Sequence, residues 1–86
     1  MKAAVIETPG RVVLREVPDP QPAPDEVIVS VALAGLCGTD LHIYAGEVNY
    51  VYPIIPGHEV VGTIVEVGDG VADLMPGMRV AFDPNI

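Results

Sequence analysis

The apolar residues of the chain fall into short stretches that predict β-strands separated by turns. The strands are expected at residues 2–6, 11–17, 26–34, 59–67 and 79–82. In the third stretch, Val27, Val29, Val31 and Leu33 share one face of a strand with period two, while Ser30 and Ala32 keep the other face small. Short strands at intervals of about ten residues are typical of a small barrel or sandwich.

Prolines and glycines mark the turns between these strands. Thr8-Pro9-Gly10 lies between the first two stretches and predicts an opening hairpin. Prolines then alternate through residues 17–24, which favours an extended path without ladder hydrogen bonds. We expect a surface connection within one domain there, and an interdomain linker is the alternative. The Pro76-Gly77 pair predicts the turn before the last strand.

The segment from Thr39 to Tyr44 lacks alternation and predicts a turn of helix, with Thr39 or Asp40 as its N-cap. Residues 46–56 are irregular and predict a loop over a site. The tyrosines at 44, 50 and 52 could line a pocket, but we expect them to pack.

Composition limits the chain to one small domain with a modest, valine-rich β-core, because it has 86 residues, no Trp and one Phe. The net charge of -8 comes from scattered acids, which indicates a solvated surface. Only four cationic residues are present, so neither nucleic acid nor an anionic membrane is expected as a partner. The single cysteine cannot form an internal disulfide, and no apolar run approaches the ~18 residues of a membrane span, so we expect a cytoplasmic protein.

Two short clusters gather the residues that bear chemistry. The only cysteine, Cys37, is followed 21 residues later by His58 and then Glu59. A thiolate, an imidazole and a carboxylate are the donors of an open, catalytic zinc site. Each residue has a plainer interpretation, since Cys37 could be a small buried apolar residue and His58-Glu59 a surface pair. Their joint occurrence beside Pro56 and glycines favours zinc.

A proton leaving a substrate held at such a site needs a route to solvent. Thr39 and His42, three residues apart, predict a hydroxyl–imidazole relay. Asp40 would accept the spare N–H of a ligating histidine and fix its tautomer, although Thr39-Asp40 taken alone is most simply a helix cap.

The motifs at 35–42, Gly-Leu-Cys-Gly-Thr-Asp-Leu-His, and at 56–68, Pro-Gly-His-Glu-Val-Val-Gly-Thr-Ile-Val-Glu-Val-Gly, resemble the start of the catalytic domain of zinc-dependent medium-chain alcohol dehydrogenases. The resemblance covers residues 1–86 and implies a mainly β, partly open GroES-like barrel that is incomplete here. It implies Cys37 and His58 as zinc ligands, Glu59 as an alternate or near ligand, Thr39 and His42 as the proton relay, and Asp40 as a residue that orients a ligand.

The likeness leans towards the polyol, butanediol and threonine dehydrogenase branch. It implies a secondary alcohol or polyol as substrate, NAD or NADP bound by a Rossmann domain that these residues lack, and a homo-oligomeric full-length enzyme. One departure is Met78, where the family commonly has Asp. We expect the 86 residues alone to be inactive. The alternatives are a zinc-binding module without redox activity and a non-catalytic GroES-like barrel.

Overall fold

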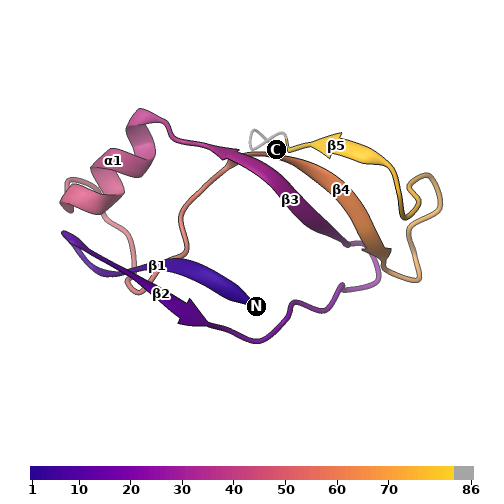
Figure 1. Ribbon diagram of the computed structural model, residues 1–86, viewed down its shortest axis with the longest axis horizontal. Coiled ribbons are helices and arrows are strands. Elements are labelled where there is room, and N and C mark those ends of the chain that lie inside the picture. Colours follow the sequence, from indigo (N-terminus) through magenta and orange to yellow (C-terminus); the bar gives the residue numbers. More distant parts are fainter. Residues whose placement is uncertain (83–86) are drawn as a thin grey trace. The chain divides into compact units, whose positions relative to one another are not determined.

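The computed structural model describes residues 1–82 as a mainly β protein with one helix (Figure 1). The elements are β1 (Lys2–Thr8), β2 (Arg11–Glu16), β3 (Val27–Gly35), α1 (Gly38–Ala45), β4 (Glu59–Val67) and β5 (Arg79–Ala81). All five predicted strands are therefore confirmed, with ends that differ by at most two residues. The strands form a two-stranded sheet, β1-β2, and a three-stranded sheet, β3-β4-β5, and neither sheet is closed into a barrel.

The chain divides into two units, and the first contains residues 1–19 and 36–57. Its antiparallel hairpin, β1-β2, turns at Gly10, whose φ of 82° lies in the left-handed region that favours glycine. This confirms the hairpin predicted from Thr8-Pro9-Gly10. A bulge shifts the register of the ladder between Ile6 and Thr8. Ile6 stays paired with Val12, and its N–H and carbonyl exchange hydrogen bonds with Ile54. Strand β1 is thereby fastened to the loop that follows α1.

The core of the first unit comes from β1 and α1. Its buried apolar side chains are Ala3, Val5, Ile6 and Ile43. The C-terminal end of α1 meets the hairpin turn, because the Gly10 N–H donates to the Tyr44 carbonyl and the Tyr44 hydroxyl donates to the Gly10 carbonyl. These two hydrogen bonds set where the helix lies against the hairpin.

The second unit contains residues 20–35 and 58–82 of the described chain and is built on the antiparallel sheet β3-β4-β5. The β3-β4 ladder has register shifts between Ile28 and Val29 and between Val31 and Leu33. The second shift skips Ala32, so the uninterrupted two-residue alternation predicted for this strand is wrong. A bulge places two residues of one strand opposite one residue of its partner, and it changes the direction of the side chains that follow. Leu33 is 72% exposed.

The proline-rich segment crosses the division between the two units after Asp19. Its later part is fastened to the end of β4, where the Gly68 N–H donates to the Glu26 carbonyl and the Gly70 N–H donates to the Pro24 carbonyl. A Cβ on Gly68 would lie 2.0 Å from the Ala23 carbonyl oxygen, so glycine permits this approach.

The turn before β5 carries Met78, the residue that departs from the family pattern. The Ile64 N–H donates to the Met78 carbonyl, and the Gly77 N–H donates to the Ile64 carbonyl. Both hydrogen bonds use main-chain atoms, so this pairing does not require an aspartate at position 78. Among residues 1–82, no helix is long and apolar enough to cross a membrane.

Gly62, in β4, provides a test of the sheet packing. A Cβ there would lie 2.2 Å from the Ser30 carbonyl oxygen and 2.7 Å from Val29 Cγ1. We expect Gly62→Ala to destabilise the fold by about 1–3 kcal/mol, because overpacking forces the backbone to shift. The measurement is the free energy of unfolding in urea.

Gly38→Ala is the control for that experiment. A Cβ at Gly38 meets nothing within 4 Å, and alanine suits a helix better than glycine. This variant should unfold at the same or a higher urea concentration than the wild type. An unchanged midpoint for Gly62→Ala would contradict the close approach of β3 and β4.

The hairpin also contains a charge cluster with a predicted pH dependence. Arg15, and secondarily Arg11, hydrogen-bond to the Glu7 carboxylate and lower its pKa from the ordinary value of 4.5. A lowered carboxyl pKa stabilises the fold above the ordinary pKa, and the contribution disappears as the pH falls through the lowered pKa. Wild-type stability should therefore fall relative to Glu7→Gln as the pH decreases below 4.5.

Urea midpoints measured as a function of pH check this expectation. In an Arg15→Gln background, the pH profiles with Glu7 and with Glu7→Gln should be nearly parallel, since Arg15 is the main cause of the lowered Glu7 pKa. Parallel pH profiles for the wild type and Glu7→Gln would show that the pair makes no contribution.

Candidate metal centre

The ends of β3 and β4 bring the metal-ligand residue types together. Gly35 ends β3 and pairs with Glu59, which begins β4. Cys37 follows Gly35 by two residues, and His58 directly precedes Glu59. The pairing of Gly35 with Glu59 therefore brings the backbone near Cys37 to the backbone near His58, although these two residues are 21 apart in sequence.

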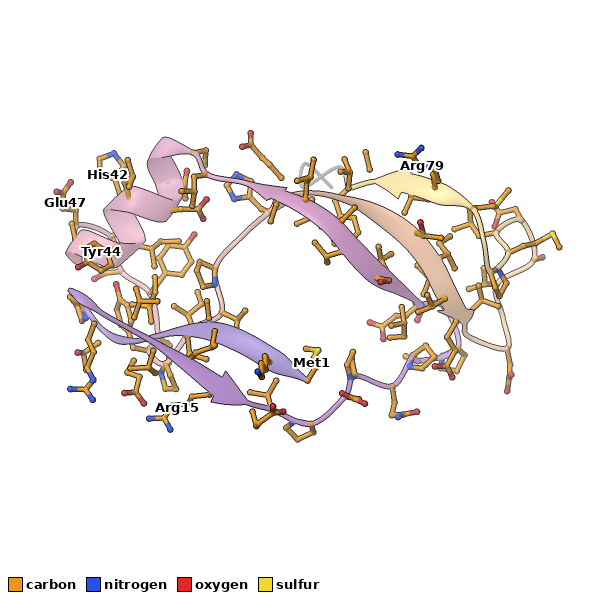
Figure 2. The ribbon with its side chains drawn as sticks, viewed as in Figure 1. Met1, Arg15, His42, Tyr44, Glu47 and Arg79 are labelled. Carbon is orange, nitrogen blue, oxygen red and sulfur yellow. The ribbon has the colours of Figure 1, made fainter. Side chains whose placement is uncertain are left out.

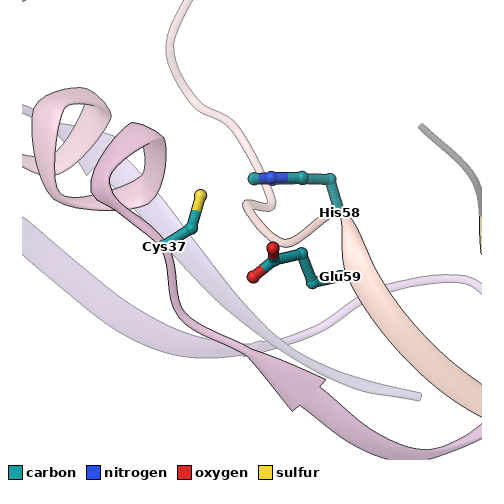
Figure 3. Close-up of side chains that lie close together, drawn as sticks. All are labelled: Cys37, His58 and Glu59. Atoms are coloured by element: carbon teal, nitrogen blue, oxygen red, sulfur yellow. The ribbon is translucent and has the colours of Figure 1, made fainter. Parts of the chain in front are cut away.

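The side chains of Cys37, His58 and Glu59 lie close together (Figure 3). Each offers one ligand atom, and these atoms all lie within 4.8 Å of one another. Cys37 and His58 are partly buried and Glu59 is exposed. This combination of sulfur, nitrogen and oxygen donors matches the ligand types of catalytic zinc.

The Glu59 carboxylate lies over Gly35. A Cβ on Gly35 would be 3.3 Å from Glu59 Oε2 and 3.4 Å from Glu59 Cβ. These separations are tighter than ordinary van der Waals contact, so the missing side chain at Gly35 gives the carboxylate its room. The glycine that precedes the cysteine motif thus helps to shape the donor cluster.

The residue that caps the N-terminus of α1 differs from the predicted one. Cys37 is the N-cap, with extended backbone angles, so the prediction that Thr39 or Asp40 caps the helix is wrong in position. Asp40 occupies the third helical position, and its carboxylate accepts a hydrogen bond of 3.2 Å from the Cys37 N–H in a capping box. Asp40 is buried, and this bond orients the backbone that carries the thiol. Its predicted contact with a histidine ligand stays a prediction.

The first turn of α1 closes around Cys37. The N–H groups of Asp40 and Leu41 both point to the Cys37 carbonyl, at 3.1 and 3.4 Å. The backbone of Cys37 is therefore held at the start of the helix.

Thr39 and His42 both lie on α1, three residues apart, and both are exposed. Residues with this spacing are neighbours on one face of a helix. The relay through these two residues stays a prediction.

Sequence reasoning missed a contact at the far end of α1. His42 Nδ1 lies 2.6 Å from Glu47 Oε2, and Figure 2 shows the two side chains close together at the outer side of the helix. The sequence signal that could have predicted this contact is Gly46, because a glycine that ends a helix brings the following residue, here Glu47, back towards the last turn.

Two of the tyrosines donate hydrogen bonds to main-chain carbonyls, and the prediction that the tyrosines pack stays a prediction. The Tyr52 hydroxyl donates to the Ile43 carbonyl at 2.5 Å, and the Tyr44 hydroxyl donates to the Gly10 carbonyl at 3.1 Å. Both bonds fasten segments of the first unit to one another. Tyr50 is 45% exposed.

Comparison with known proteins agrees with this geometry. Residues 23–85 match the alcohol dehydrogenase GroES-like domain. A probable zinc-binding alcohol dehydrogenase of Mycobacterium tuberculosis is 48% identical over 94% of this chain and 23% of its own length. Sorbitol dehydrogenase of Ovis aries is 41% identical over 94% of this chain and 24% of its own length.

A solved structure shows the same fold. The alcohol dehydrogenase RspB of Escherichia coli CFT073, in complex with NADH, superposes with a TM-score of 0.90 and 46% identity over 98% of this chain and 24% of that chain. The chain thus spans about a quarter of the length of the proteins it matches. The match extends over most of its residues, and it confirms the resemblance to a GroES-like fold. The chain belongs to the alcohol dehydrogenase family that carries this GroES-like domain.

Proposed function

We propose that this chain is the N-terminal part of a zinc-dependent oxidoreductase that transfers hydride between a secondary alcohol or polyol and NAD or NADP. The observation that carries the proposal is the convergence of Cys37, His58 and Glu59 within 4.8 Å. The likeness to sorbitol dehydrogenase supports a polyol as substrate. The likeness to an NADH-bound alcohol dehydrogenase supports a nicotinamide cofactor.

The donor set fits zinc. Structural zinc sites more often use several cysteines, whereas catalytic sites use three protein ligands of mixed type and leave one position open. Cys37 and His58 are the principal ligands in this proposal, and Glu59 is an alternate or near ligand. Cys37, His58 and Glu59, whose donor atoms lie within 4.8 Å of one another, are the residues that would hold the ion.

Zinc, when bound, supplies Lewis acidity that makes an alcohol hydroxyl easier to deprotonate. In the proposed mechanism Thr39 receives the proton through its hydroxyl and passes it to the His42 imidazole, which releases a proton to solvent. Both residues lie on the exposed side of α1, where solvent is accessible. Asp40 holds the Cys37 backbone in place and so fixes the direction of the thiol.

Cys37→Ser tests the metal centre. A hydroxyl is a much poorer zinc ligand than a thiolate. We expect the intact protein to lose its bound zinc and at least about 100-fold of its polyol-dependent NAD(P) reduction. Zinc content by elemental analysis and initial rates are the measurements.

His42→Asn is the comparison for that variant, because it should retain zinc while turnover falls. A Cys37→Ser protein with full zinc content would overturn the site. Zinc binding without NAD(P) reduction by the intact wild-type protein would instead indicate a zinc-binding GroES-like module without redox activity.

We also expect residues 1–86 alone to be catalytically inactive. The described part of the chain contains only antiparallel strand pairs, whereas nucleotide-binding domains of the Rossmann type need parallel strands joined by helices. The purified 86-residue chain, supplied with zinc, a polyol and NAD or NADP, should produce no reduced nicotinamide. Reduction that depends on Cys37 would contradict this expectation.

A further inference from the structure

We propose that Glu47 is a positioning residue for His42: its carboxylate accepts the Nδ1–H and leaves Nε2 of the imidazole free to take the relayed proton. This inference rests on the proposed function, in which His42 carries a proton. It adds a residue that lies outside the helix and outside the two sequence motifs.

The conformation at the C-terminus of α1 brings Glu47 close to His42. Gly46 has φ 77° and ψ 21°, the left-handed conformation of a helix C-cap glycine. The Gly46 N–H donates to the Ile43 carbonyl at 3.2 Å, and the Glu47 N–H donates to the His42 carbonyl at 3.0 Å. These are the two hydrogen bonds of a Schellman motif.

A Schellman motif brings the residue after the glycine back beside the residue three positions inside the helix end. Apolar side chains commonly meet there. In this chain the two positions are occupied by Glu47 and His42, so the motif produces a contact of 2.6 Å between a carboxylate oxygen and Nδ1. The main-chain bond between the same two residues restrains both backbones.

The contact decides which nitrogen of the neutral ring carries the proton. A neutral imidazole has one N–H donor and one acceptor nitrogen, and the partner of one nitrogen selects the tautomer. An ionised carboxylate only accepts, so it selects the Nδ1–H form. Nε2 then carries the lone pair that a proton from the Thr39 hydroxyl requires.

The pair contributes little to stability by itself. The side chains of His42 and Glu47 are 57% and 60% exposed, and exposed ion pairs are weakened by solvent. The expected effect of losing Glu47 is therefore on the tautomer and on proton transfer, and the fold should persist. This makes the role separable from a structural one.

The first test is ¹⁵N NMR of the histidine rings in the intact, zinc-loaded protein, recorded at a pH where His42 is neutral. The His42 signals are identified by their loss in His42→Asn. In the wild type they should report Nδ1–H. Glu47→Ala should shift them towards Nε2–H, whereas Glu47→Gln should retain Nδ1–H, because its amide oxygen still accepts a hydrogen bond. Glu66→Ala, at an exposed glutamate of β4, should leave them unchanged.

Steady-state kinetics with sorbitol as the probe polyol provides the second test. Glu47→Ala should lower kcat about tenfold with unchanged KM and zinc content, and Glu47→Gln should recover most of the loss. Wild-type tautomer signals in Glu47→Ala would overturn the proposal. So would wild-type kcat in Glu47→Ala if His42→Asn is slow. If His42→Asn is as fast as the wild type, the relay in the proposed function is wrong, whereas the NMR result still decides whether Glu47 sets the tautomer.

Discussion

The antiparallel pairing of Gly35 with Glu59 is the constraint on which the candidate site depends. It closes the β3-β4 ladder at the end where both motifs lie, and the three donor side chains come from residues within two positions of that pair. Main-chain hydrogen bonds between strands do not depend on the identity of the side chains. The ladder therefore fixes Gly35 beside Glu59, and Cys37 and His58 lie within two residues of this pair along the chain.

Helix α1 extends this arrangement to the groups proposed to move protons. Its N-cap is Cys37, its third position holds Asp40, and its last turn contains His42. The helix and its N-cap thus carry a proposed metal ligand, the carboxylate that hydrogen-bonds to the backbone of that ligand, and the proposed relay. Sites built on helices hold their geometry more closely than sites on loops.

Much of this could be predicted from the sequence, because the strands are valine-rich and the turns are marked by proline and glycine. The residues of the donor cluster could be named for their chemistry before their proximity was known. The bulge at Ala32 could not be predicted, since it is a property of the pairing with β4 rather than of β3 itself. The cap was misplaced because cysteine is not among the usual N-cap residues. The Glu47 contact depends on the conformation of Gly46, which a helical periodicity does not reveal.

The packing of Gly46 has a consequence for distant positions. A Cβ on Gly46 would lie 2.8 Å from the Pro9 Cβ, so the glycine that ends α1 is wedged against the turn of the hairpin. Pro9 lies on the surface and has no side-chain polar atom, and by itself it would pass for a replaceable turn residue. Its contact with Gly46 connects it mechanically to the orientation of a histidine 33 positions later in the sequence. A substitution that moves Pro9 would therefore disturb the end of α1 and the Glu47–His42 contact as well as the hairpin.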